Sequence, residues 1–238
     1  MDFDWTTISD DPNDPRAKAA MRRLLPELRR VHTDGDVTDY VVREVRGRRV
    51  LDIGVVSHAA HYFESPGWRH GRIHRAADYC VGIDIIAPLV DELNGRGFNV
   101  RCIDATSDAD LGERFDVVFI GDVIEHVANP GALLGFAARH LQPDGRLLVA
   151  TPNPYSRAFY RSFRREGIIV VNLDHVAWFT PTMAYELARR SGLKMIAYHL
   201  NKPLSGWRLA WKRLLWRMNW SPVEFSFSDH LFEFALPG

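Results

Sequence analysis

The segment from Phe115 to Pro154, FDVVFIGDVIEHVANPGALLGFAARHLQPDGRLLVATPNP, constrains the fold of this chain more than any other part of the sequence. It has the pattern of an apolar strand, a polar turn, a helix, a Pro-Asp-Gly turn and a second strand. In open α/β sheets, ligands bind just beyond the carboxyl ends of the strands. Because Asp122, Glu125 and His126 follow the first of these strands, we expect chemistry at this point.

Further short apolar runs repeat the strand pattern along the chain. They are RRVLDIGVV (48–56), VGIDII (81–86), NVRCIDA (99–105), KMIAYHL (194–200) and HLFEFALPG (230–238). Strands that alternate with helical segments predict a parallel sheet with right-handed crossovers. Residues 16–32, interrupted by Pro26, and residues 37–45 have helical spacing. We therefore expect an N-terminal helical cover over residues 1–46 and a single domain over residues 47–238.

The composition excludes several classes of protein. The 238 residues have a formal net charge of zero, which predicts no overall attraction to nucleic acid or to a membrane. Cys80 and Cys102 lack the spacing of metal ligands, so we expect reduced core thiols in a cytoplasmic protein. The N-terminal MDFDWTTISDD has no apolar core of a signal peptide, and no apolar run is long enough to cross a bilayer.

The runs VLDIG (50–54) and VGIDI (81–85), taken with residues 115–154, resemble the class I S-adenosylmethionine-dependent methyltransferases. The resemblance extends from about Gly47 to Leu200. It implies a Rossmann-like, mostly parallel sheet of seven strands with helices on both faces, in which the last strand is inserted antiparallel. It also implies S-adenosylmethionine as the cofactor.

The resemblance also assigns cofactor-binding roles to residues at the strand ends. Gly54 leaves room for a ligand next to the backbone, since it has no Cβ. Asp84 is expected to bind the ribose hydroxyls through charge-assisted hydrogen bonds, and Asp104 to accept a hydrogen bond from the adenine amino group. The alternative is that both aspartates only cap the turns that follow them. The predicted cofactor-binding residues are Asp52, Gly54, Asp84, Ile85, Asp104, Ala105 and Gly121.

The loop after the first strand departs from the family pattern. Val56 occupies a position where a further glycine is usual, and Ser57 and His58 follow it. The missing glycines exclude a nicotinamide dinucleotide fingerprint, which needs G-x-G-x-x-G. The departure also keeps a second class of function open, that of a non-catalytic, methyltransferase-like scaffold.

Residues 55–80 are expected to form a long lid insertion, because loops of this length are usually functional. The run GWRH before VGIDI resembles methyltransferases of bacterial glycan and lipopolysaccharide pathways. Trp68 has two interpretations, stacking on adenine or a sugar, or plugging the edge of the sheet. His70 is a second candidate functional residue in this segment.

Methyl transfer to a hydroxyl requires orientation of the acceptor and removal of its proton. If a helix begins at Asp122, then Asp122, Glu125 and His126 share one face of it. Carboxylates and imidazoles are ligands of Mg²⁺ or Mn²⁺, and His175 is the candidate fourth ligand. The cluster resembles those of small-RNA 3′-end, quinone-pathway and sugar methyltransferases. The predicted catalytic residues are Asp122, His126 and His175, and the alternative is an acceptor pocket without a metal.

Two further segments are candidates for recognition. Residues 155–165 mix arginines with aromatic residues, which suits phosphates, bases or sugars. Residues 206–220 form an amphipathic helix whose apolar stripe includes Trp207, Trp211 and Met218. This stripe is compatible with a membrane surface, but docking on the sheet or on a second subunit is favoured, which suggests a homodimer.

The sequence thus predicts an S-adenosylmethionine-dependent O-methyltransferase of a small hydroxylated acceptor, most simply a sugar or glycan precursor. An RNA ribose 2′-O-methyltransferase is the nearest alternative enzyme. The zero net charge argues against it, because RNA binding usually leaves a basic footprint.

Overall fold

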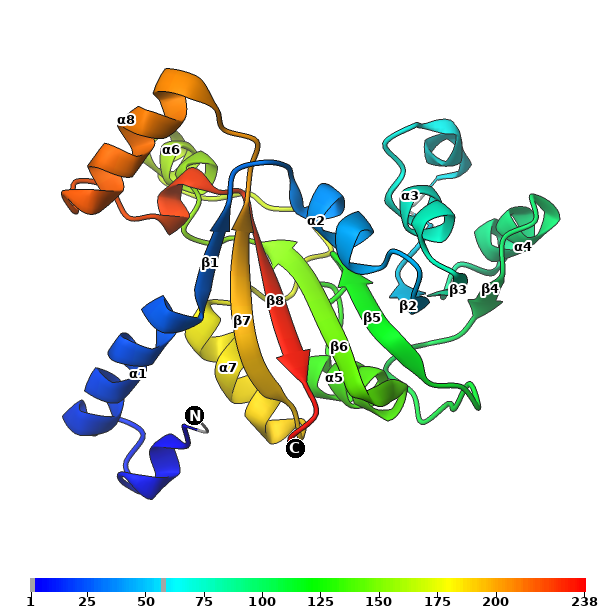
Figure 1. Ribbon diagram of the computed structural model, residues 1–238, viewed down its shortest axis with the longest axis horizontal. Coiled ribbons are helices and arrows are strands. Elements are labelled where there is room, and N and C mark those ends of the chain that lie inside the picture. The colour runs from blue at the N-terminus through cyan, green and yellow to red at the C-terminus, as the bar shows by residue number, and fades with distance from the viewer. Residues whose placement is uncertain (1–2, 57–58) are drawn as a thin grey trace.

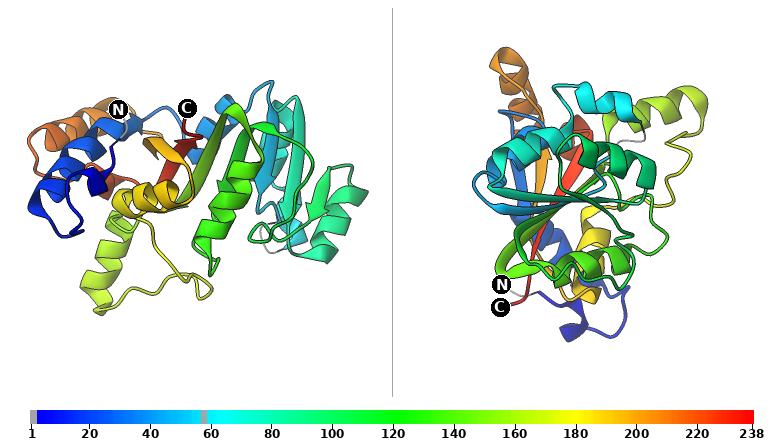
Figure 2. Two further views of the ribbon diagram at one scale, coloured as in Figure 1. Left: turned by 90° about the horizontal axis from the view of Figure 1, so that it is seen from below. Right: turned by 90° about the vertical axis from the view of Figure 1, so that its right-hand side faces the viewer.

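The computed structural model describes residues 3–56 and 59–238, and Ser57 and His58 lie outside the described residues. Within these ranges the chain forms one eight-stranded sheet of order β1-β7-β8-β6-β5-β2-β3-β4, with helices on both faces (Figures 1 and 2). The strands are β1 (Arg29–His32), β2 (Arg49–Ile53), β3 (Tyr79–Asp84), β4 (Val100–Cys102), β5 (Phe115–Gly121), β6 (Leu141–Pro152), β7 (Lys194–Asn201) and β8 (Asp229–Ala235).

The helices are α1 (Pro15–Leu28), α2 (Val37–Glu44), α3 (Arg69–Ala76), α4 (Ala87–Gly95), α5 (Pro130–Arg139), α6 (Arg157–Glu166), α7 (Pro181–Arg190) and α8 (Gly206–Arg217). Three short 3₁₀ helices accompany them, η1 (Trp5–Thr7), η2 (Ala60–Glu64) and η3 (Glu224–Ser226). Within the described residues, no helix is both long and apolar enough to cross a membrane.

The order of the strands confirms the predicted class of fold. All seven expected strands are present, and β8 lies antiparallel between β6 and β7, while the other strand pairs are parallel. In Figure 1, β1, β5, β6 and β7 run upward, whereas β2, β3 and β4 are seen almost end-on because the sheet is twisted. Open α/β sheets bind ligands beyond the carboxyl ends of their parallel strands, so a site is expected along that edge.

The expectation of seven strands was wrong by one. Residues 29–32 form the edge strand β1, which pairs in parallel with β7, so the N-terminal cover is not purely helical. Helix α1 ends at Leu28, two residues after Pro26, and Arg29 already has extended dihedrals. The short sequence RRVH has no alternating apolar pattern by which an edge strand is recognised.

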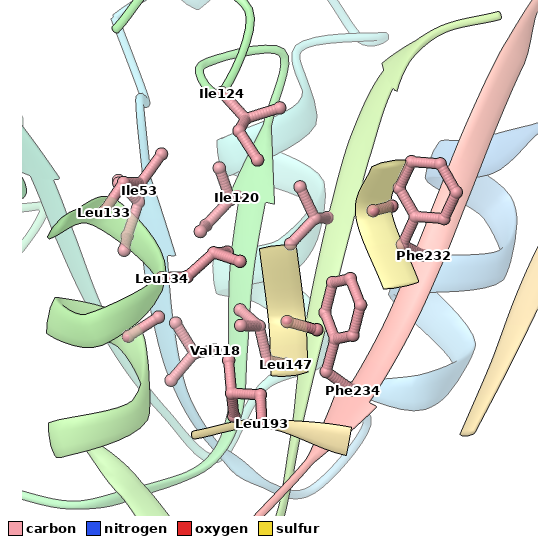
Figure 3. Close-up of a cluster of buried hydrophobic side chains, with 14 of the residues drawn as sticks. Ile53, Val118, Ile120, Ile124, Leu133, Leu134, Leu147, Leu193, Phe232 and Phe234 are labelled. Carbon is pink, nitrogen blue, oxygen red and sulfur yellow. The ribbon is translucent and has the colours of Figure 1, made fainter. Parts of the chain in front are cut away.

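Side chains that alternate along β5 build the core on both faces of the sheet. Val118 and Ile120 face α5 and α7, where Leu133, Leu134 and Phe232 complete the larger core cluster (Figure 3). Val117 and Phe119 face the opposite side, against α2 and α3. Since both faces of β5 are buried, the strand reads as a nearly continuous apolar run. The site at its carboxyl end is therefore built on a rigid element.

Residues 55–80, which the sequence suggested as a lid insertion, have more regular structure than was expected. They contain η2 and α3, and α3 is the crossover that joins β2 to its parallel neighbour β3. Ile73 of α3 is fully buried in the core. A parallel pair needs a crossover of at least a dozen residues, so the length of this segment has a structural cause.

The expectation of two core cysteines holds for only one of them. Both cysteines are free thiols, but Cys80 is buried whereas Cys102 is exposed. Cys102 is the last residue of β4, which is the edge strand of the sheet, so one of its sides has no neighbouring strand.

Candidate active site

A cavity of about 850 Å³ lies beyond the carboxyl ends of β2, β3, β4 and β5. It is lined by all of the residues that the sequence assigned to cofactor, catalysis or metal, together with Thr38 of α2 and Arg69 of α3. The predicted residues that it brings together are Asp52, Gly54, Asp84, Ile85, Asp104, Ala105, Gly121, Asp122, Glu125, His126 and His175.

The end of β2 is held in place by a buried pair. Oδ2 of Asp52 lies 2.7 Å from Nδ1 of His70, and both side chains are buried. This contact fixes the carboxylate at the base of the cavity, and it gives His70 a structural role that the sequence left open. Gly54 follows with a φ of +85°, and a Cβ at this position would overlap with Cγ2 of Val123. Glycine is therefore required here both by the backbone and by space.

Asp84 and Asp104 do cap the turns that follow them, and they also line the cavity. The amides of Ile85 and Ile86 donate to Oδ1 of Asp84, at 2.8 and 3.2 Å. Both the amide and the hydroxyl of Thr106 donate to Oδ1 of Asp104, at 2.7 Å each. The hydrogen bond from the backbone amide lowers the pKa of Asp104. A carboxylate has about four acceptor positions, so capping leaves capacity for a ligand.

The departure at Val56 has a packing explanation. Val56 is buried in a small apolar cluster with Phe63 and Trp68, and its amide donates to Oδ2 of Asp84 at 3.1 Å. Nε1 of Trp68 donates to the carbonyl of Val55 at 3.1 Å, and the ring packs edge-on against Phe98. The structure therefore favours the packing interpretation of Trp68, which supports the loop that borders the cavity.

The prediction of a helix from Asp122 was wrong. Residues 122–129 form turns, and α5 begins only at Pro130, where the side chain of Asn129 accepts from the amide of Ala132. Asn as N-cap followed by Pro at the first helical position is a strong start signal. Asp122 itself has a φ of +55°. Its carboxylate lies 2.8 Å from Nη2 of Arg69, outside the cluster that the next residues form.

That cluster consists of Glu125, His126 and His175, each of which offers one ligand atom within 4.8 Å of the others. Asp122, which was also predicted to be a ligand, is not part of it. The amide of Val176 donates to the carbonyl of Glu125 at 2.8 Å, which holds the segment with His175 against the turn. The rings of His126 and His175 meet edge to face, with centroids 4.5 Å apart.

The side chains of the cluster differ in their surroundings. Glu125 is fully buried, and burial raises its pKa to about 7, while the hydroxyl of Thr151 donates to its Oε2 at 3.0 Å. Partial burial and the neighbouring His126 lower the pKa of His175. Nδ1 of His126 lies 3.1 Å from Oδ2 of Asp174. Oε1 of Glu125 and Nδ1 of His175 are buried without a hydrogen-bond partner among the described residues.

Sequence reasoning missed three residues of the site. Arg69 stands between the two residues singled out in GWRH, and Thr151 and Asp174 contact the cluster from segments distant in sequence. Asp174 directly precedes His175, and an acid next to a candidate histidine was the one signal available for it. Thr151 had none, because its position opposite Glu125 depends on the pairing of β5 with β6.

The fold and the matched residues define the class of this protein. The family model described as a methyltransferase domain matches residues 18–198, which is most of the chain. The chain therefore belongs to this family, and its sheet places it among the class I S-adenosylmethionine-dependent methyltransferases.

Curated relatives include enzymes named for one pathway. The ubiquinone biosynthesis O-methyltransferase of Cereibacter sphaeroides is 32% identical over 152 residues, which are 62% of this chain and 60% of that protein. The protein of the same name from Azorhizobium caulinodans is 31% identical over 178 residues, or 71% and 65% of the two chains. The matched part thus spans less than two thirds of the length of these relatives.

Solved structures confirm the fold alone, since their sequences are distant. The CcbJ methyltransferase of Streptomyces caelestis has a TM-score of 0.58 at 14% identity, over 84% of this chain and 94% of that one. An S-adenosylmethionine-dependent methyltransferase of Archaeoglobus fulgidus has a TM-score of 0.56 at 17% identity, over 83% and 92%.

Proposed function

We propose that this chain transfers a methyl group from S-adenosylmethionine to a hydroxyl oxygen of a small acceptor. One observation supports this proposal above the others. A single cavity is lined by the acids that follow β3 and β4 and, beyond β5, by the cluster of Glu125, His126 and His175. A cofactor site and a group that can take a proton thus open into the same space.

The residues at the strand ends fit the parts of the cofactor. Asp84 and Asp104 offer carboxylate oxygens to the ribose and the adenine amino group, and Gly54 keeps the backbone accessible. Asp52 and Gly121 line the same cavity. When bound, the cofactor supplies a methyl group that its sulfonium already activates, so the protein has to orient the acceptor and accept its proton.

His126 is the proposed base. Its Nδ1 lies against the carboxylate of Asp174, which favours the tautomer with the proton on Nδ1 and the lone pair on Nε2. An acid that orients a histidine in this way is a common arrangement of general bases. His175, whose ring meets that of His126, is proposed to contact the acceptor hydroxyl.

The acidity of the acceptor favours an aromatic hydroxyl. A phenol has a pKa of about 10, within reach of an imidazole base, whereas a sugar hydroxyl is a far weaker acid. The curated relatives are named for ubiquinone biosynthesis. We therefore propose a ring hydroxyl of a quinone-type precursor as the acceptor, and the sugar acceptor stays a prediction from the sequence.

The same cluster is a candidate site for a divalent cation. One carboxylate and two imidazoles suit Mn²⁺ better than Mg²⁺, which prefers oxygen ligands, and the buried Oε1 of Glu125 and Nδ1 of His175 are the atoms that a cation would satisfy. Such an ion would lower the pKa of a bound hydroxyl.

Thermal denaturation with Mn²⁺ tests this cation site. Mn²⁺ is expected to raise the melting temperature of the wild type and of Asp122→Asn, but not that of Glu125→Gln. An equal effect on all three proteins would exclude this site.

A methyl-transfer assay with labelled S-adenosylmethionine tests the function. A panel of phenolic and catecholic acids is compared with a panel of sugars, and His126→Gln is the inactive control. Label in an ether of a phenolic acceptor is the expected result. Label in a sugar would support the prediction from the sequence. No transfer to any hydroxyl, together with no cofactor binding, would leave the non-catalytic scaffold.

A further inference from the structure

The sequence favoured docking of the apolar stripe of α8 on the sheet or on a second subunit, and within this chain most of the stripe is exposed. Leu209, Leu215 and Trp216 face the protein, and the ring of Trp216 lies 5.9 Å from that of Phe227. Trp207, Trp211, Leu214 and Met218 are exposed, and Trp207 has 75% of its surface accessible. At 100° per residue these four lie opposite Leu209 and Trp216, with Leu215 between the two sides, so the stripe points away from the molecule.

Helix α6 and the segment after it extend this exposed surface. Tyr160 and Phe163 of α6 are exposed, as are Ile168, Val170 and Leu173, and 96% of the surface of Leu173 is accessible. The ring of Tyr160 packs on Phe225 of η3, while Nζ of Lys212 in α8 donates to Oγ of Ser226. Both helices thus rest on η3, and both project from the same end of the molecule (Figures 1 and 2).

Arginines flank these apolar side chains. The exposed residues of α6, of residues 167–176 and of α8 are called the α6–α8 surface. Its acidic residues are Glu166 and Asp174, and its exposed arginines are Arg157, Arg161, Arg164, Arg165, Arg208, Arg213 and Arg217. Since the whole chain has a formal net charge of zero, the remainder is net negative. The molecule is therefore electrically polarised, with its positive end at the α6–α8 surface.

We propose that the α6–α8 surface binds the surface of a bilayer rich in anionic phospholipid. Tryptophan and other apolar side chains that project outward between arginines are typical of helices lying in the membrane interface. The exposed aliphatic side chains have no use in stacking on nucleic-acid bases. A twofold dimer through this face would place the arginines of one copy against those of the other, which disfavours self-association.

The surface also borders the mouth of the cavity. Asn172, Asp174 and His175 line the cavity, and the exposed Leu173 lies between Asn172 and Asp174 in the same segment. Binding to a bilayer through this segment places the mouth at the lipid surface. An acceptor dissolved in the membrane then reaches the site without crossing water.

Vesicle flotation tests the proposal on the intact protein. Vesicles of phosphatidylcholine with phosphatidylglycerol are compared with phosphatidylcholine alone. Binding to the anionic vesicles is expected, and it should weaken as salt is raised, because the charges are screened. Arg213→Gln with Arg217→Gln should lower the partition coefficient about 30-fold, because each arginine near an anionic surface contributes about 1 kcal/mol to binding.

A matched control removes two exposed arginines from α1, with Arg22→Gln and Arg23→Gln, and should retain the binding of the wild type. Trp207→Ser with Trp211→Ser should lower the partition coefficient at least about 10-fold. Binding of S-adenosylhomocysteine confirms that each variant is folded. The proposal is overturned if the protein binds anionic vesicles no better than vesicles of phosphatidylcholine alone. It is equally overturned if the α1 control loses as much vesicle binding as the variant with Arg213→Gln and Arg217→Gln. It is also overturned if the tryptophan pair instead abolishes a dimer or binding to single-stranded RNA.

Discussion

The guanidinium of Arg69 pairs with the carboxylate of Asp122 at 2.8 Å, across the carboxyl end of β5. A Cβ at Gly121 would overlap with Nη1 of Arg69 and with the ring of Phe119. The absence of a side chain at Gly121 therefore leaves space for the guanidinium of Arg69 next to the backbone. The pair joins α3 to the turn after β5. The sequence placed Asp122 among the metal ligands, but its carboxylate pairs with Arg69 and is not part of the cluster of Glu125, His126 and His175.

Asp122 is expected to tolerate only residues that accept a left-handed backbone. Its φ is +55°, which asparagine adopts readily and a β-branched residue does not. Asp122→Val should lower the free energy of unfolding by roughly 1–2 kcal/mol more than Asp122→Asn. Urea denaturation of both variants measures this difference, and equal midpoints would contradict the backbone argument.

Substitution of Gly54 is expected to destabilise the protein for a second reason besides its backbone angle. Gly54→Ala meets both a φ of +85° and an overlap with Val123, whereas Gly97→Ala has a φ of +90° with open space around the new Cβ. Gly97→Ala should cost about 1–2 kcal/mol for the backbone alone, and Gly54→Ala about 1–3 kcal/mol more for overpacking. Chemical denaturation of the two variants gives the comparison. Similar losses at both positions would show that the contact with Val123 relaxes freely.

Asp174 is expected to act through the orientation of His126. Asp174→Asn keeps the shape of the side chain but removes the charge that holds Nδ1 of the imidazole. We expect kcat to fall about 10- to 100-fold, while the KM for S-adenosylmethionine stays near that of the wild type. Steady-state kinetics with a phenolic acceptor measure both. An unchanged kcat would show that Asp174 does not contribute to catalysis by orienting His126.

The stability of the fold should decrease with acid because of His230. Burial lowers the pKa of His230 to about 4, from an ordinary value of 6.5. Below the higher value the unfolded chain binds a proton that the folded chain does not, so stability present at neutral pH is lost as the pH falls from 6.5 towards 4. The loss is at most about 2 kcal/mol at pH 5, from the pKa difference alone.

Urea denaturation at neutral pH and near pH 5 checks this dependence. His230→Gln has no proton to gain, so its stability should change less between the two pH values, even if it starts lower. An identical pH dependence in the wild type and in His230→Gln would assign the acid sensitivity to other groups.

The sequence predicted the parts of this protein that local patterns determine. Asp84 and Asp104 were located because Asp84 ends one predicted strand and Asp104 comes just after another, and the carboxyl ends of parallel strands meet at one edge. The edge strand β1 was missed because RRVH carries no periodic signal, and its pairing with β7 joins residues distant in sequence. The position of Asp122 was missed for a similar reason, since its partner Arg69 comes from another crossover.

The direction in which the apolar stripe of α8 points could also not be predicted from the sequence. Helical spacing identifies the apolar side of α8, but the side on which a helix docks depends on what lies beneath it. Here the ring of Trp216 packs on Phe227, next to η3, which leaves Trp207 and Trp211 exposed.

Calorimetric titration with S-adenosylhomocysteine tests the central claim most directly, because the account requires a cofactor in the cavity beyond β2 and β3. The wild type and Asp91→Asn, which removes an exposed carboxylate from α4, are expected to bind with similar affinity. Asp84→Asn should weaken binding by roughly 1.5–3 kcal/mol, the range of a hydrogen bond to a charged group. Equal binding by all three proteins, or no binding by the wild type, would contradict the cofactor site.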